Sequence, residues 1–175
     1  IALSLVGSEM CIRDSPWTNP IPKEDFGLNY NADKDFEGDT WRVVLDYQLD
    51  EDTLLYGSIA TGFVSGGFAE TCGSEFTCQP YNDEENTNIE FGFKADRMDG
   101  RLRFNGAIFQ TEYESLQRDS VITRIVGDTQ FQETASVNEG ETTATGFEIE
   151  FQYLATENLR IDGFLGLLDH EYDVY

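Results

Sequence analysis

The sequence predicts an all-β fold: an antiparallel up-and-down transmembrane β-barrel segment with about six long strands in three hairpins, forming an incomplete barrel. Apolar and polar residues alternate over segments of about 10 residues or more, whereas strands in soluble domains average about 5–6 residues. A tilted strand needs about 9–11 residues to cross a bilayer, so these segments have a suitable length. Short and long connections also alternate along the chain, as they do in membrane barrels.

The composition excludes several classes of protein. The 175 residues include 34 acidic and 11 basic side chains, a formal charge of −23, so a nucleic-acid partner is not expected. Aromatic residues make up 13% of the chain, which argues against acidic disorder. No apolar run reaches the length of a membrane helix, roughly 18 residues, which excludes a helical membrane protein but not a membrane barrel.

The first 39 residues do not share the strand pattern. Residues 1–15 show no alternation and no basic region before an apolar run, so we predict a non-native, adaptor-like segment rather than a signal peptide. We exclude it from the fold, together with Cys11; the alternative is a genuine terminal segment. Residues 16–39 are rich in Pro, Asn and Asp and are predicted to be a loop or irregular lead-in. The barrel strands are expected within residues 40–175.

The first predicted hairpin joins Thr40–Leu49 to Leu54–Val64 through a short acidic turn. On its first strand one face is apolar, with Trp41, Val43, Leu45, Tyr47 and Leu49. The facing of the second strand is ambiguous from the pattern. One candidate set for the apolar face is Leu55, Ile59 and Phe63, which we favour, and the other is Leu54, Tyr56 and Ala60.

A long loop is expected from Ser65 to about Asn88. It contains Cys72 and Cys78, and so close a pair in a loop predicts a disulfide and an oxidising compartment; the alternative is two free thiols. The acidic run at 83–85 has oxygen ligands suitable for Ca²⁺ but lacks the spacing of an EF-hand, so we interpret it as a solvated charge run.

The second predicted hairpin spans Ile89 to Tyr113 and shows the alternation most clearly. Asp99 and Gly100 supply the pair with positive φ that a tight hairpin turn favours. Phe91 and Phe93 share a face with Leu102 and Phe104 across the turn. The third hairpin follows a long connection from Gln117 to Thr143, which includes a possible short hairpin around Gly127-Asp128. Its strands are expected at Ala144–Leu154 and Leu159–Leu168.

The charged residues of the strands fall on the polar face of each strand. In a wide barrel they would line a wet lumen, whereas in a soluble sheet they would form the solvated face. Aromatic residues near strand ends fit the aromatic girdles of membrane proteins or, in a soluble sheet, a core. The predicted lumen-facing residues are Arg42, Asp46, Glu90, Lys94, Arg103, Glu148 and Glu150.

Several motifs in order, from Thr40 to Tyr175, resemble the TonB-dependent outer-membrane receptors. Residues 54–68, LLYGSIATGFVSGGF, resemble a strand of that family. The pattern around Glu90-x-Gly92-x-Lys94 and the strand within 101–117, ending in Leu116-Gln117, resemble the strands that follow. Asn138-x-Gly140 with Gly146-x-Glu148-x-Glu150 is similar to a later strand entry. Each motif alone is weak, and together at this spacing they are specific.

The resemblance implies a barrel of about 22 strands with a plugged lumen, in the outer membrane of a Gram-negative bacterium. It implies uptake of a scarce ligand, commonly an iron–siderophore chelate. The implied partners are outer-membrane lipid, a siderophore-like or other small ligand, and the TonB energy-coupling complex, which acts through a plug domain not visible here. We therefore expect an internal fragment of the barrel domain that does not transport by itself.

We expect ligand contacts in the two long loops, at Phe68, Phe76, Tyr81, Arg118 and Arg124. No catalytic constellation stands out, so neither an enzyme nor a cofactor is expected. His170 is the only histidine and is expected at the surface, near a strand end, which disfavours a zinc site. Two alternatives stay open: a soluble acidic β-sheet domain that binds a ligand or partner, and a secreted β-rich enzyme. The enzyme would need two carboxylates about 5–9.5 Å apart with separated pKa values.

Overall fold

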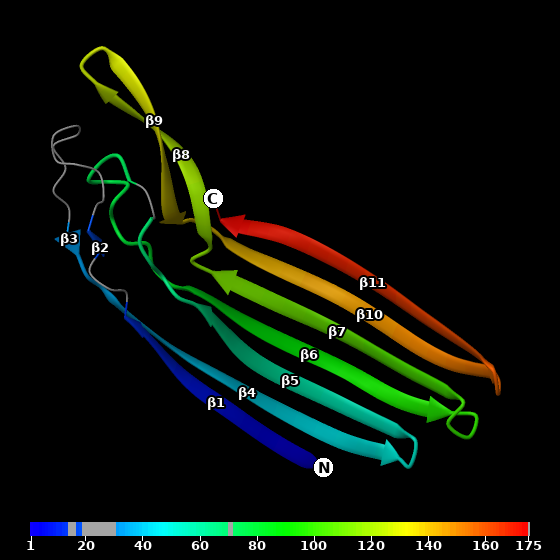
Figure 1. Cartoon of the computed structure of the whole chain (residues 1–175). Coiled ribbons are helices and arrows are strands. Elements are labelled where there is room, and N and C mark those ends of the chain that lie inside the picture. The colour runs from blue at the N-terminus through cyan, green and yellow to red at the C-terminus, as the bar shows by residue number, and fades with distance from the viewer. Residues whose placement is uncertain (14–16, 19–30, 70–71, 175) are drawn as a thin grey trace.

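A computed structural model describes residues 1–13, 17–18, 31–69 and 72–174. These residues form a seven-stranded antiparallel sheet and two two-stranded sheets. Figure 1 shows how the strands are arranged. None of them forms a helix long and apolar enough to cross a membrane. In spatial order the large sheet consists of β1 (Ala2–Arg13), β4 (Asp35–Asp50), β5 (Thr53–Val64), β6 (Glu84–Arg97), β7 (Leu102–Glu114), β10 (Glu141–Thr156) and β11 (Leu159–Val174).

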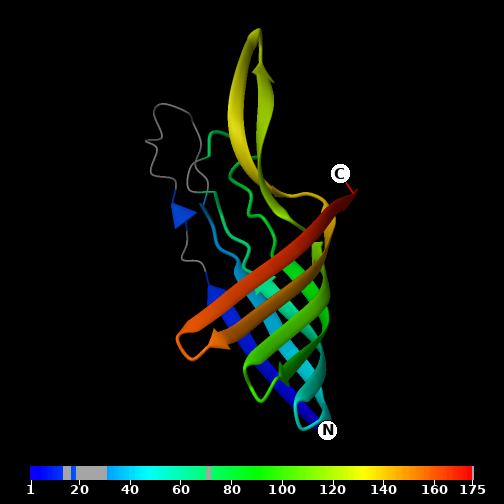
Figure 2. The same ribbon diagram turned by 90° about the vertical axis from the view of Figure 1, so that its right-hand side faces the viewer.

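The three predicted hairpins are confirmed as β4–β5, β6–β7 and β10–β11. Their turns lie at one end of the sheet, and the long connections 65–83 and 115–140 lie at the other (Figure 1). The second long connection contains the hairpin of β8 (Gln117–Val126) and β9 (Thr129–Asn138), which is longer than predicted and projects beyond the sheet (Figure 2). The other small sheet pairs β2 (Trp17–Thr18) with β3 (Asn31–Ala32).

The large sheet is curved but open. Figure 2 shows the strands curling like part of a barrel wall, and within the described residues β1 and β11 are edge strands that do not meet. The expected incomplete barrel of antiparallel strands is therefore confirmed.

Several strands are longer than the sequence pattern predicted. β4 begins at Asp35 rather than Thr40, β6 at Glu84 rather than Ile89, and β10 at Glu141 rather than Ala144. Apart from the buried Phe36 and from Gly38 in β4, the additional residues are polar, so they lack the alternation on which the prediction depends. Backbone hydrogen bonds continue through them because pairing of the main chain does not need apolar side chains.

The N-terminal segment differs most from expectation. We excluded residues 1–15 from the fold, yet Ala2–Arg13 forms β1 and pairs with β4 along its whole length, with Leu5 opposite Val43. An edge strand presents unpaired N–H and C=O groups, and an extended neighbouring segment satisfies them. The adaptor-like origin of the segment stays a prediction. In the predicted lead-in 16–39, residues 16 and 19–30 lie outside the described residues.

The strand register assigns the two faces of the sheet. Leu55 lies opposite Phe93 and Ile59 opposite Ile89, so the favoured facing of these two β5 residues agrees with the structure. None of the described residues forms a layer over the apolar face: Phe91 is 60% and Leu167 is 62% exposed. Other exposed members of this apolar face are Trp41, Leu45, Tyr47, Leu55, Ile89, Ile108, Phe151 and Leu165.

The turn of the central hairpin agrees with its predicted chemistry. Asp99 and Gly100 have φ values of 57° and 79°, and the amide of Arg101 donates to the carbonyl of Met98 at 3.2 Å. Met98 also has a positive φ, 57°, so the connection between the strands is the four residues 98–101 rather than two.

Candidate functional site at the loop end of the sheet

Two side chains tie the bases of the two long connections together, and we call this pair, Gln117 and Asn138, the rim latch. The side-chain oxygen of Asn138 accepts from the Asn82 amide at 2.6 Å. Its side-chain nitrogen donates to the carbonyls of Asn82 and Ser115, each at 2.9 Å. One amide group thus bonds to both connections, which requires a donor and an acceptor on the same short side chain.

Gln117 completes the rim latch from the first residue of β8. Its backbone amide donates to the Glu84 carboxylate at 2.9 Å. Its side-chain nitrogen donates to the carbonyls of Ser65 and Asn82, each at 3.0 Å. The amide of Leu116 donates to the carbonyl of Gly140, which has a φ of 90°. The motif residues singled out in the sequence therefore hold the loop bases in place.

The first long connection forms a small closed loop between Cys72 and Cys78, which are joined by a disulfide with Cα atoms 5.1 Å apart. Thr77 lies inside this loop and is only 2% exposed. Its hydroxyl oxygen accepts from the amides of Gly73 and Ser74, each at 3.0 Å. The loop is thus organised by a buried hydroxyl as well as by the covalent bond.

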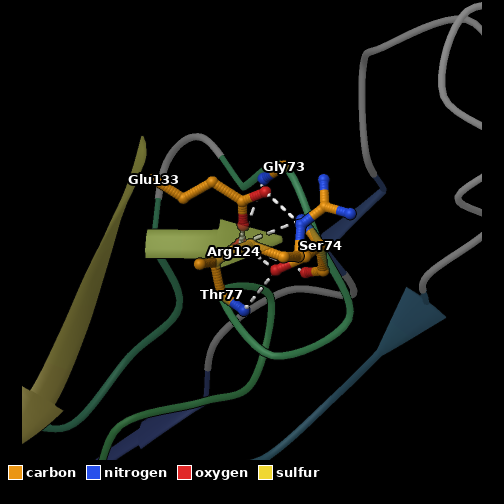
Figure 3. A network of polar contacts seen from close by, with 5 residues as sticks. All are labelled: Gly73, Ser74, Thr77, Arg124 and Glu133. Carbon is orange, nitrogen blue, oxygen red and sulfur yellow. Dashed lines mark hydrogen bonds and ion pairs between the residues drawn. The ribbon is translucent and has the colours of Figure 1, made fainter. Parts of the chain in front are cut away.

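The disulfide loop is docked on the β8–β9 hairpin through Glu133 (Figure 3). Arg124 donates to one carboxylate oxygen of Glu133 at 2.6 Å, and the Thr77 hydroxyl lies 3.4 Å from the other. Burial by itself raises the pKa of Glu133, but hydrogen bonds from Ser74 and Arg124, with the charge of Arg124, leave the pKa below its ordinary value. The carboxylate is therefore held ionised between the two connections.

The predicted ligand-contact residues lie in different environments. Arg124 is paired with Glu133 and lies over the Phe131 ring, 5.3 Å from its centroid, so its charge is already neutralised. Phe76 is 60% exposed on the disulfide loop, and Phe68 is half-buried. Tyr81 forms a backbone bridge with Gly67. Arg118 lies over the ring of Tyr172, 5.4 Å from its centroid. Ligand contact by these residues stays a prediction.

The structure adds two residues that sequence reasoning did not select, Thr142 and Tyr172, and it shows a hydrogen bond of His170 that was not predicted. The Thr142 hydroxyl lies 2.7 Å from Nε2 of His170 and donates to the Glu171 carbonyl at 2.7 Å. The rings of His170 and Tyr172 are 5.1 Å apart. These residues belong to the polar ends of β10 and β11, and the predicted strands stopped short of them.

The predicted lumen-facing residues share one face of the sheet. The register places Asp46 opposite Tyr56, Glu150 opposite Asn105, and Arg103 opposite Asp96, with which it forms an ion pair at 2.9 Å. An open hollow of about 270 Å³ lies on this face. It is lined by Tyr56, Lys94, Asn105, Glu148, Glu150 and Phe164, among others.

Charged groups on this face do not gather into a metal centre. Among the described residues, no three His, Cys, Asp or Glu side chains are arranged so that they could hold a metal ion. The side-chain oxygen of Asn105 is buried and has no hydrogen-bond partner among the residues that the structure describes. The face offers a hollow and polar groups, and these are suited to contact with another polar surface or a hydrated ligand.

A protein-family model, that of the TonB dependent receptor-like β-barrel, matches residues 17–173, nearly the whole chain. The chain belongs to this family. TonB-dependent receptors are receptors and transporters rather than enzymes, so the expected absence of catalysis is confirmed.

Curated relatives of this TonB-dependent receptor chain include the metal-pseudopaline receptor CntO of Pseudomonas aeruginosa, from strains UCBPP-PA14 and PAO1. The chain is 30% identical to it over 132 residues, which cover 75% of this chain and 17% of the relative. The chain therefore spans about a sixth of the length of these relatives.

Solved structures of receptors share the fold of this chain. The ferric yersiniabactin uptake receptor FyuA of Yersinia pestis matches with a TM-score of 0.67 and 19% identity, over 83% of this chain and 20% of the receptor. The ferric preacinetobactin receptor BauA of Acinetobacter baumannii matches with a TM-score of 0.63 and 18% identity, over 97% of this chain and 22% of the receptor. The strands described above thus have the arrangement of part of a TonB-dependent receptor wall.

Proposed function

We propose that the receptor to which this chain belongs lies in the outer membrane of a Gram-negative bacterium and takes up a scarce metal chelate of the siderophore class. Import is coupled to the TonB complex. The observation that carries the proposal is the uncovered apolar face of a sheet whose opposite face is polar, in a chain of this family.

The apolar face supports contact with lipid. Side chains as large as Phe91 and Leu167 are more than half exposed on it, and a soluble protein rarely leaves so continuous an apolar patch uncovered. Exposing apolar side chains to water is unfavourable, and hydrocarbon removes this cost because the side chains then have apolar neighbours. The strands satisfy their main-chain groups by pairing. The opposite face, with Glu90 and Lys94, would line the lumen.

The loop end supports the receptor role. The rim latch and the Glu133 network fix two long connections against one another at the mouth of the proposed barrel. Ligands are commonly bound by loops that a rigid scaffold positions. A chelate is proposed as the ligand because CntO, FyuA and BauA are named as receptors for metal-pseudopaline, ferric yersiniabactin and ferric preacinetobactin. TonB coupling is assigned to a plug domain outside these 175 residues.

The proposal is tested in the host bacterium under metal limitation. Deleting the receptor gene should abolish uptake of at least one radiolabelled chelate of iron, nickel, zinc or copper, and the full-length gene should restore it. A protonophore should stop this uptake, since TonB coupling uses the proton gradient. Uptake that is unchanged by deletion for every chelate contradicts the proposed ligand class. A full-length product that stays soluble without detergent contradicts the membrane location.

A further inference from the structure

Three side chains converge at the loop end of the polar face, and we call Arg118, His170 and Tyr172 the mouth cluster. Arg118 is the second residue of β8, whereas His170 and Tyr172 lie two residues apart on β11. Thr142 pairs with Tyr172 and Ala144 with His170, which places these residues on the same face as Glu148. The cluster thus joins the second long connection to the wall.

The ring of His170 is held in a defined orientation by Thr142. The Thr142 side chain is only 3% exposed, and its hydroxyl donates its hydrogen to the Glu171 carbonyl at 2.7 Å. The same oxygen lies 2.7 Å from Nε2 of His170. Since a hydroxyl has one hydrogen, Nε2 must be the donor in this contact. His170 therefore presents a fixed ring edge beside Tyr172.

Arg118 keeps its hydrogen-bonding edges available. Arg103, Arg124 and Arg160 each form an ion pair with a carboxylate. Within the part of the chain that the structure describes, the guanidinium of Arg118 has no ion pair or hydrogen bond, and it lies over the Tyr172 ring. Asp119 next to it accepts a hydrogen bond from Ser136 at 2.6 Å.

An unpaired guanidinium is notable in a chain with a formal charge of −23. A guanidinium that lies over an aromatic ring can still use its in-plane N–H groups, and these match a carboxylate in a two-bond geometry. The adjacent rings of Tyr172 and His170 offer a surface on which a planar group can stack. The cluster therefore combines one anion contact with one stacking contact.

We propose that the mouth cluster is a subsite for a planar anion, such as the aromatic carboxylate or phenolate portion of a ligand. Arg118 binds the anionic oxygens, Tyr172 and His170 contact the ring, and Thr142 positions His170. This inference deepens the proposed function and rests on it, because the subsite lies where a chelate would enter the lumen.

The test uses the full-length receptor in detergent micelles, with benzoate as the probe and saturation-transfer NMR as the measurement. Benzoate should bind, and cyclohexanecarboxylate, which has the same charge without a planar ring, should bind more weakly. Arg118→Gln should weaken benzoate binding roughly tenfold, as expected for the loss of a charge-assisted two-bond contact. Arg118→Lys should lose part of the affinity because its point charge lacks the planar geometry.

The matched control is Arg160→Gln, since Arg160 lies at the opposite end of the sheet beside Asp162 and should leave benzoate binding unchanged. The folded state of each variant is checked by its resistance to protease. Benzoate binding that is equal in the receptor and in the folded Arg118→Gln variant overturns the subsite, as does the absence of binding. Loss of chelate uptake on gene deletion is measured separately, so a failed subsite and a failed transport proposal give different results.

Discussion

At the scale of single residues, the loop end depends on side chains with two kinds of hydrogen-bonding group. Asn138 accepts from one backbone amide and donates to carbonyls of both connections. A carboxylate of the same size would keep the acceptor but lose the donors, and it would place a negative charge beside carbonyl oxygens. The identity of Asn138, and not only its size, is therefore required.

We predict that Asn138→Asp loosens the loop bases and lowers the free energy of unfolding by roughly 1–3 kcal/mol, the usual cost of leaving partly buried polar groups unpaired. The measurement is the rate of proteolytic cleavage within the two long connections, together with the melting temperature. Asn158→Asp, in the exposed turn at the other end of the sheet, is the control. Equal effects of the two substitutions would contradict the role of the rim latch.

Glu133 gives the loop end a dependence on pH. Its pKa in the folded state lies below its ordinary value, so the carboxylate stabilises the docked loop fully above the unfolded pKa of about 4.3. This stabilisation is lost as the pH falls through the lower pKa of the folded state. The charge of Glu133 should therefore not limit docking near neutral pH.

We predict that amide exchange in residues 72–78 becomes faster as the pH is lowered below about 4, beyond the change of the intrinsic exchange rate. Hydrogen-exchange mass spectrometry would measure it. Glu133→Gln should weaken docking at neutral pH and remove this acid dependence, whereas Glu157→Gln, in the opposite turn, should change neither. An acid response that persists in Glu133→Gln would assign it to another group.

At the scale of elements, aromatic rings of one strand lie over glycine residues of the next strand. Gly146 on β10 lies opposite Phe109 on β7, whose ring covers it so closely that an added Cβ would be 2.1 Å from a ring carbon. Tyr56 covers Gly92 in the same way across β5 and β6. Such pairs bury the exposed main chain of glycine and fix the register of neighbouring strands.

We predict that Gly146→Ala destabilises the sheet, because the methyl group and the Phe109 ring cannot occupy the same space. The cost should be much smaller when Phe109 is also replaced by alanine, which leaves room for the methyl group. Thermal unfolding of the two single variants and the double variant would give the coupling free energy. Additive effects would show that the close approach does not set the stability of this pair.

At the scale of the whole molecule, the seven-stranded sheet has two open edges. β1 and β11 each carry main-chain groups that pair on one side only within the described residues. Such edges are not tolerated in hydrocarbon, where no water is available to satisfy them. In the proposed membrane location, both edges of this sheet would therefore need further strands.

We predict that cells expressing only these 175 residues do not take up the chelate that we propose as the ligand of the full-length receptor. The comparison is made in a strain lacking the receptor gene, with equal amounts of the two proteins confirmed by immunoblotting. The full-length gene serves as the positive control. Uptake by the chain alone would show that these seven strands suffice, contrary to the requirement for closure.

Much of this architecture follows from the sequence because alternation of apolar and polar residues reports directly on the two faces of a strand. The hairpin at Asp99-Gly100 and the position of Leu55 on the apolar face could be predicted in this way. The pairing of β1, the polar strand ends and the contact of His170 with Thr142 were not. They depend on main-chain pairing and on residues far apart in the chain, neither of which leaves a periodic signal.

The rim latch has a consequence for how such a receptor changes over generations. Gln117 and Asn138 hold the loop bases mainly through main-chain carbonyls, which every residue type provides. The tips of the connections can therefore accumulate substitutions without loosening their attachment to the wall. Residues at the tips can therefore change contacts with whatever binds there while the register of the sheet stays the same.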